Sequence, residues 1–147
     1  MSRARTERGT ALVEVTWLSL LLLVPLLYVV LAVFEVQRAA YGVDAASRAA
    51  ARAYSLAPTE AAGSARARTA ASVALADQGL RLSPGQLGIR CVPAPTSCLS
   101  PGSVIHVHIS CPVALPLMPS ALGGNTPSIR VESDQAVPYG SFREHRQ

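Results

Sequence analysis

The first third of the chain is dominated by one apolar stretch. Residues 15–34 read VTWLSLLLLVPLLYVVLAVF and contain no charged side chain. A helix of this length spans about 30 Å, the thickness of the hydrocarbon core of a bilayer, and a proline such as Pro25 is tolerated inside such helices. The stretch exceeds the roughly 7–15 apolar residues of a cleaved secretory signal. It therefore predicts a retained membrane-spanning helix.

Helical character continues beyond this stretch. Residues 35–56, EVQRAAYGVDAASRAAARAYSL, are rich in alanine, the best helix former, and Asp44 and Arg48 are spaced as a favourable i,i+4 ion pair. Gly42 is expected to weaken this helix by about 0.5–1 kcal/mol. The pattern predicts one long helix over residues 10–56, with an inward stripe of small residues at Ala39, Val43, Ala46, Ala50 and Ala53.

A second, shorter helix is predicted over residues 59–78. Pro58 or Thr59 can begin it, and Gly79 follows its end. Large apolar side chains are scarce in it, so this helix needs a partner surface. Its expected inward row is Thr69, Val73, Ala76 and Leu80.

After Leu80 the apolar side chains recur at every second position, which is typical of β-strands. Strands are predicted near 88–92, 103–111 and 128–137, separated by proline-rich links. In the second, one face carries Ile105, Val107, Ile109 and Cys111, and the other carries His106, His108 and Ser110. The predicted fold class is α+β: a transmembrane helix that extends into a long helix, a second helix, and a small, mostly antiparallel sheet of about three strands.

The charges that flank the apolar stretch predict its orientation in the membrane. Arg3, Arg5 and Arg8 precede the apolar stretch with only Glu7 against them, and short cationic flanks stay cytoplasmic. The remainder is then extracytoplasmic. The formal net charge of +4 does not indicate nucleic-acid binding, because the basic residues are scattered and lack interleaved aromatic residues.

Cysteine is the first candidate for chemistry, since an exported head permits oxidation. Cys91 and Cys98 flank a predicted turn, which favours a disulfide. Cys111 is then left as a buried thiol, an intermolecular link, or the true partner of one of the other two. His106 and His108 lack the spacing of a zinc site, so no metal is expected. No catalytic motif or cofactor-binding motif is present, and we expect neither enzyme activity nor a cofactor.

Glu14 stands directly before the apolar stretch. It is either an ordinary interfacial residue that reaches headgroup water, or part of a functional element with the residues around it. Cleavage after Gly9 would make Thr10 the new N terminus and Glu14 the fifth residue of the mature chain.

This arrangement resembles the class III signal of type IV pilins and pseudopilins: a short basic leader that ends in glycine, a glutamate at the fifth mature position, and an apolar helix. Residues 7–56 resemble the TadE-like family of pilus-assembly proteins more narrowly. The matching elements are Arg8, Gly9, Thr10, Ala11, Val13 and Glu14, then Glu35 and Arg38 at the outer membrane edge, then the Ala/Arg-rich residues 49–53.

The resemblance implies a minor pseudopilin that supports assembly of a tight-adherence (Flp) pilus. Residues 1–9 would be a cytoplasmic leader removed by a prepilin peptidase, residues 10–56 the membrane and extended helix, and residues 57–147 the exported head. Glu14 and Glu35 would serve assembly and register, and the implied partners are other pilin-like subunits, the Tad membrane platform and membrane lipid. The alternative is an unprocessed, membrane-anchored module that binds an envelope component.

Overall fold

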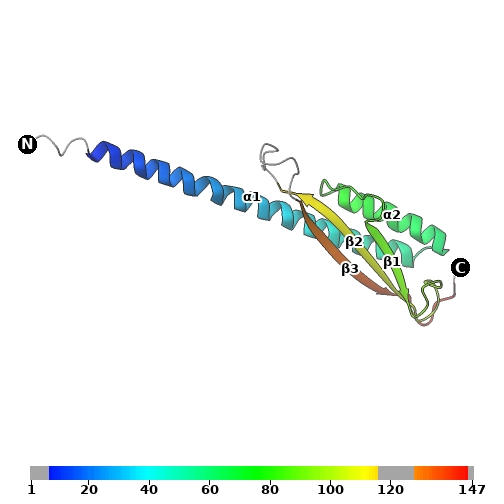
Figure 1. Ribbon diagram of the computed structural model, residues 1–147. Coiled ribbons are helices and arrows are strands. Elements are labelled where there is room, and N and C mark those ends of the chain that lie inside the picture. The colour runs from blue at the N-terminus through cyan, green and yellow to red at the C-terminus, as the bar shows by residue number, and fades with distance from the viewer. Residues whose placement is uncertain (1–6, 116–127, 146–147) are drawn as a thin grey trace, which may run out of the picture.

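The structure is a computed structural model that describes residues 7–115 and 128–145. Its dominant element is the helix α1, Glu7–Ser55, which runs without interruption through Pro25 (Figure 1). The predicted merger of the apolar stretch and the alanine-rich segment into one helix is confirmed. Arg48 pairs with Asp44 as expected.

The C-terminal half of α1 carries the head of the protein. Ala39, Val43, Ala46 and Ala50 are buried and Ala53 is half-buried, as predicted for the stripe of small residues. Close packing explains the glycine at position 42, which the sequence did not reveal. A Cβ at Gly42 would lie 2.9 Å from Cγ of Gln78, so the glycine lets the chain after the second helix approach α1 closely.

The second helix, α2, spans Glu60–Ala76, close to the predicted residues 59–78. The Thr59 hydroxyl accepts a hydrogen bond from the backbone N–H of Ala62 (3.2 Å), which satisfies one of the donors left free at a helix start. α2 ends at Ala76. Gly79, three residues later, has a φ of 70°, and the backbone N–H of the following Leu80 donates to the carbonyl of Leu75 in the last turn of the helix.

The predicted inward row of α2 is wrong. The buried residues are Gly63, Ala67, Ala71 and Leu75, whereas Thr69, Val73 and Ala76 are exposed; of the predicted row only Leu80, beyond the helix, packs against the core. The reason is close packing on α1. A Cβ at Gly63 would lie 3.1 Å from the ring of Tyr54, so the smallest side chains of α2, not its valine, face the neighbouring helix.

Three antiparallel strands complete the α+β fold in the order β1–β2–β3 (Figure 1). They span Leu87–Val92, Val104–Ala114 and Ser128–Pro138. Ile105, Val107, Ile109 and Cys111 are buried in the core, and His106, His108 and Ser110 alternate with them, as predicted. The sheet contacts α1 through β2 and β3.

Polar contacts join the head to α1 at two places. Ser47 is fully buried, and its hydroxyl lies 3.0 Å from that of Ser133 on β3. At the other end, Arg143 donates to the carbonyl of Ser55, the last residue of α1 (2.9 Å), and lies over the ring of Tyr139. A cation at a helix C terminus stabilises the free carbonyls there.

Candidate functional site

Between residues 11 and 31, α1 is mostly apolar and almost entirely exposed. Within the described part of the chain, α1 is the one helix that is long and apolar enough to cross a membrane, and its most apolar window has a mean hydropathy of 2.6 with no residue buried inside the protein. Trp17 and Leu22 are about 70% exposed, for example. Such a surface needs lipid or other apolar helices around it.

Glu14 lies in this exposed helix, four residues after Thr10. Residues four apart lie on one face of an α-helix, so the backbone of Thr10 and the carboxylate of Glu14 are on the same side of α1. Glu14 makes no side-chain hydrogen bond or ion pair with another described residue. The proposed cleavage site between Gly9 and Thr10 lies within the helix, which begins at Glu7.

At the other end of the apolar stretch, Glu35 pairs with Arg38 on the same helix face. The carboxylate oxygen and the guanidinium nitrogen are 2.7 Å apart, and both side chains are well exposed. Exposed pairs of this kind contribute up to about 1 kcal/mol. The pair marks the end of the uncharged stretch, and the role of Glu35 in register stays a prediction.

The predicted disulfide joins Cys91, at the end of β1, to Cys98 in the following loop, with a Cα–Cα distance of 5.2 Å. Both residues are buried. A loop of this size stabilises the folded head by about 2–3 kcal/mol through the unfolded state. Among the alternatives left open by the sequence, Cys111 is a free, buried thiol.

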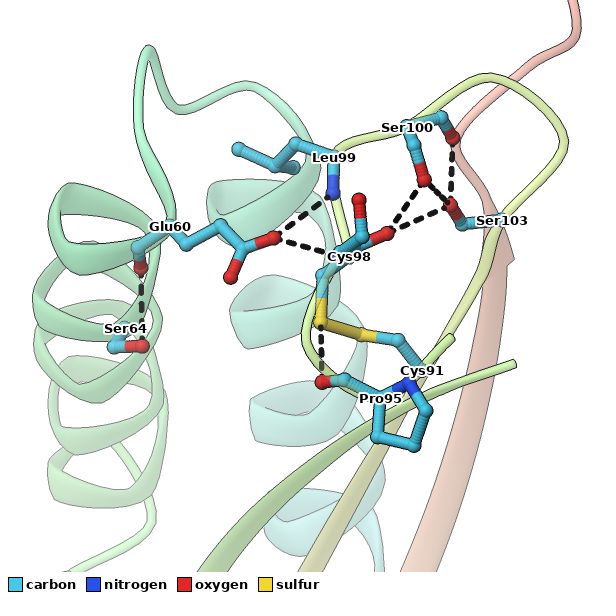
Figure 2. Close-up of a disulfide and its surroundings, with 9 residues drawn as sticks. Glu60, Ser64, Cys91, Pro95, Cys98, Leu99, Ser100 and Ser103 are labelled. Carbon is cyan, nitrogen blue, oxygen red and sulfur yellow. Dashed lines mark hydrogen bonds between the residues drawn. A yellow bond between two sulfur atoms is a disulfide. The ribbon is translucent and has the colours of Figure 1, made fainter. Parts of the chain in front are cut away.

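Glu60 anchors the disulfide loop to α2, a role that sequence patterns missed (Figure 2). One carboxylate oxygen of Glu60 accepts hydrogen bonds from the backbone N–H groups of Cys98 (2.6 Å) and Leu99 (3.4 Å). Glu60 stands in the first turn of α2, where the helix dipole favours a negative charge. Its partners are nearly forty residues away, so no local spacing could have revealed them.

Tyr54 lies beside this anchor. Burial raises the pKa of its hydroxyl, the nearby Glu60 carboxylate raises it further, and a hydrogen bond with Ser64 partly offsets both. Burial also raises the pKa of the Cys111 thiol. Because the thiolate is the nucleophile, Cys111 is poorly reactive in the folded head.

These assignments predict the outcome of thiol mapping. On the folded, non-reduced protein, we expect an alkylating reagent to label none of the three cysteines, since two are bridged and Cys111 is buried. After unfolding without a reductant, only Cys111 should be labelled, as read by peptide mass mapping. Alkylated Cys91 or Cys98 in that sample would contradict the bridge.

The face of the sheet that is turned away from the core carries ionisable side chains. His108 lies 3.1 Å from Asp134 across β2 and β3, on an exposed part of the sheet. In residues 7–115 and 128–145, no three His, Cys, Asp or Glu side chains gather as metal ligands would. Glu132 and Asp134 lie on the exposed face of β3.

No protein-family model matches the chain, and neither a curated protein nor a solved structure matches it. The arrangement of the helix and the sheet is nevertheless informative. A long, apolar N-terminal helix followed by a small antiparallel sheet packed on its C-terminal half is a pilin-like arrangement. The N-terminal end of α1, which carries both the sequence motif and the exposed apolar surface, is the candidate functional site.

Proposed function

We propose that this protein is a TadE-like minor pseudopilin that supports assembly of a tight-adherence (Flp) pilus. The observation that carries the proposal is Gly9, Thr10 and Glu14 at the head of an exposed apolar helix that continues into a folded head. The role is structural, not catalytic. A prepilin peptidase removes the leader after Gly9, and Thr10 becomes the mature N terminus.

The function proposed for Glu14 follows from the cost of an unpaired charge in the membrane. A carboxylate brought among membrane helices is costly unless it is paired, and removal of the leader creates a positive α-amino group at Thr10. Within one chain the two groups lie on one helix face, so a neighbouring subunit shifted along the axis can present its amino group to Glu14. This pairing removes the cost of the charge and sets the axial stagger between subunits.

The outer end of the apolar stretch supplies the second element of register. Glu35 and Arg38 lie where the uncharged stretch ends, at the outer membrane edge in the N-in orientation. The remaining apolar surface of α1 packs laterally against other pilin-like subunits. The head, braced by its disulfide in the oxidising exterior, caps or bridges the complex with the Tad membrane platform.

The test is the N-terminal residue of the protein recovered from the membranes of its own host, measured by intact mass. We expect Thr10, because a prepilin peptidase that reads Gly9 and Glu14 leaves this residue first. A chain that keeps Met1 or Ser2 would overturn the proposal. It would favour instead an unprocessed anchor whose head binds an envelope component.

A further inference from the structure

An apolar groove lies between α1 and the adjoining ends of β2 and β3. Its volume is about 400 Å³. The α1 side includes Tyr28, Ala32, Val33 and Val36, and the strand side is formed by Leu115 and Ile129. None of the described residues that line it is charged. We call it the hairpin groove.

The hairpin groove begins inside the predicted membrane span. At about 1.5 Å per residue, Glu14 and Glu35 are roughly 30 Å apart along α1, which matches the hydrocarbon thickness. On the same scale, Tyr28 lies about 10 Å on the cytoplasmic side of Glu35. A groove wall formed by Tyr28 and Ala32 therefore lies at the depth of the outer leaflet, below the headgroups.

The strands reach this depth because the sheet is uneven. β1 ends its pairing with β2 at Ile109, whereas β2 and β3 remain paired as far as Ala114 and Ser128. Figure 1 shows this two-stranded extension running beside α1 toward its N-terminal half. Its side chains suit a boundary with lipid. The apolar Ile129 is 44% exposed, and the charged Arg130 beside it lies on the opposite face of β3.

We propose that the hairpin groove holds a lipid acyl chain of the outer leaflet, so that the extension of β2 and β3 gives the head a second contact with the membrane. Two features support lipid as the occupant. The groove is continuous with the membrane-spanning surface of α1, and the described residues of its lining are uncharged, as hydrocarbon requires. Arg130 is placed to extend its charged end to the headgroups.

This proposal rests on the membrane assignment of α1 and not on processing at Gly9. It has a consequence for the head. With α1 as its only attachment, the head would be positioned by one helix alone; an acyl chain between α1 and Ile129 fixes in addition which side of the head faces the bilayer. In this arrangement the paired ends of β2 and β3 contact the membrane. The loop after β1, which holds the disulfide, lies at the opposite end of the sheet (Figure 1).

Fluorescence quenching by brominated acyl chains tests this. Trp17 is the single tryptophan, so a Trp17→Phe chain provides a silent background. The full chain with Ile129→Trp, or separately Leu115→Trp, is reconstituted at high dilution in phosphatidylcholine vesicles with brominated acyl chains. We expect each to lose emission to about the extent of Trp17 in the unaltered protein.

Phe142→Trp in the same background is the matched control, because Phe142 is fully exposed and lies near the C-terminal end of β3, away from the groove. It should keep its emission. Resistance of Cys111 to alkylation verifies folding of each variant. Two tryptophan positions keep the test usable if one variant fails to fold.

Three results would overturn the inference. Emission at positions 115 and 129 that is no more quenched than at position 142 would place the groove outside the lipid. Quenching that declines as the ratio of protein to lipid rises would identify a second copy of the chain as the occupant. An unquenched Trp17 would remove the membrane assignment itself. An unquenched Trp17 would also count against the proposed function, which needs the same membrane span, whereas the other two outcomes leave that function untouched and the mature N-terminal residue tests it separately.

Discussion

A Gly9→Leu chain is expected to enter the membrane normally and to keep its leader, so that the processed form is lost almost completely. Insertion depends on the apolar residues 15–34 and on the arginines before them, none of which changes. Intact mass of the membrane-bound protein reads the result. A chain that begins at Thr10 in this variant would contradict recognition of Gly9.

Two physical effects act together at Gly9. A glycine has no Cβ, so a peptidase can approach the backbone closely, and a leucine side chain blocks that approach. In addition, α1 is already helical at Gly9, and its backbone must open for cleavage. Leucine stabilises a helix by about 0.5–1 kcal/mol relative to glycine, which opposes local opening. Both effects reduce cleavage.

Leu12→Ile is the control for this experiment. It changes only the branching of an exposed apolar side chain in the next turn of α1 and leaves the cleavage site and Glu14 intact. We expect this variant to be processed like the unaltered chain. If both variants keep the leader, the loss reflects a general disturbance of the N-terminal helix and not recognition of glycine.

The positions of the elements follow from local sequence, because composition, capping residues or alternation marks each one. The apolar stretch and the alanine-rich segment predict α1 nearly to its last residue, and Thr59 and Gly79 delimit α2 by capping chemistry. The alternation from Ile105 to Cys111 assigns the faces of β2 correctly. In these elements, the spacing of side chains and the backbone preferences point to the same structure.

The contacts between elements could not be predicted in the same way. The Glu60 carboxylate serves backbone N–H groups of a distant loop, and Ser47 meets Ser133 across the helix–sheet boundary. The hairpin groove exists because β2 and β3 extend beyond β1. Each depends on how separate elements dock, and no pattern within a single element records it.

The error on α2 has a specific cause. In a helix made mostly of alanine, glycine, serine and threonine, each possible face carries at most one large apolar side chain, and Val73 and Leu75 mark different faces. The row predicted from the sequence placed Val73 inward. The structure buries Leu75 completely and leaves Val73 58% exposed, because Gly63 must lie against Tyr54 and this contact sets the rotation of the whole helix.

Leu75→Ala and Val73→Ala should therefore have very different effects on the stability of the head. Leu75 is among the largest fully buried side chains, and its truncation is expected to lower the free energy of unfolding by about 2–5 kcal/mol, through lost apolar burial and the cavity left behind. Val73→Ala should change it by less than about 0.5 kcal/mol, since the side chain is exposed and alanine favours a helix.

Cys111 supplies the readout for both variants, because its thiol is buried in the same core cluster as Leu75 and reacts only when the head opens. Alkylation of Cys111 is followed against urea in the full chain, held in detergent micelles with the disulfide intact. The midpoint for Leu75→Ala should fall by on the order of 1–3 M urea, and that for Val73→Ala should stay near the original. The reverse order would mean that α2 docks through Thr69, Val73 and Ala76. A head with so few large buried side chains has little stability to lose, so Leu75 is the residue on which the attachment of α2 depends most.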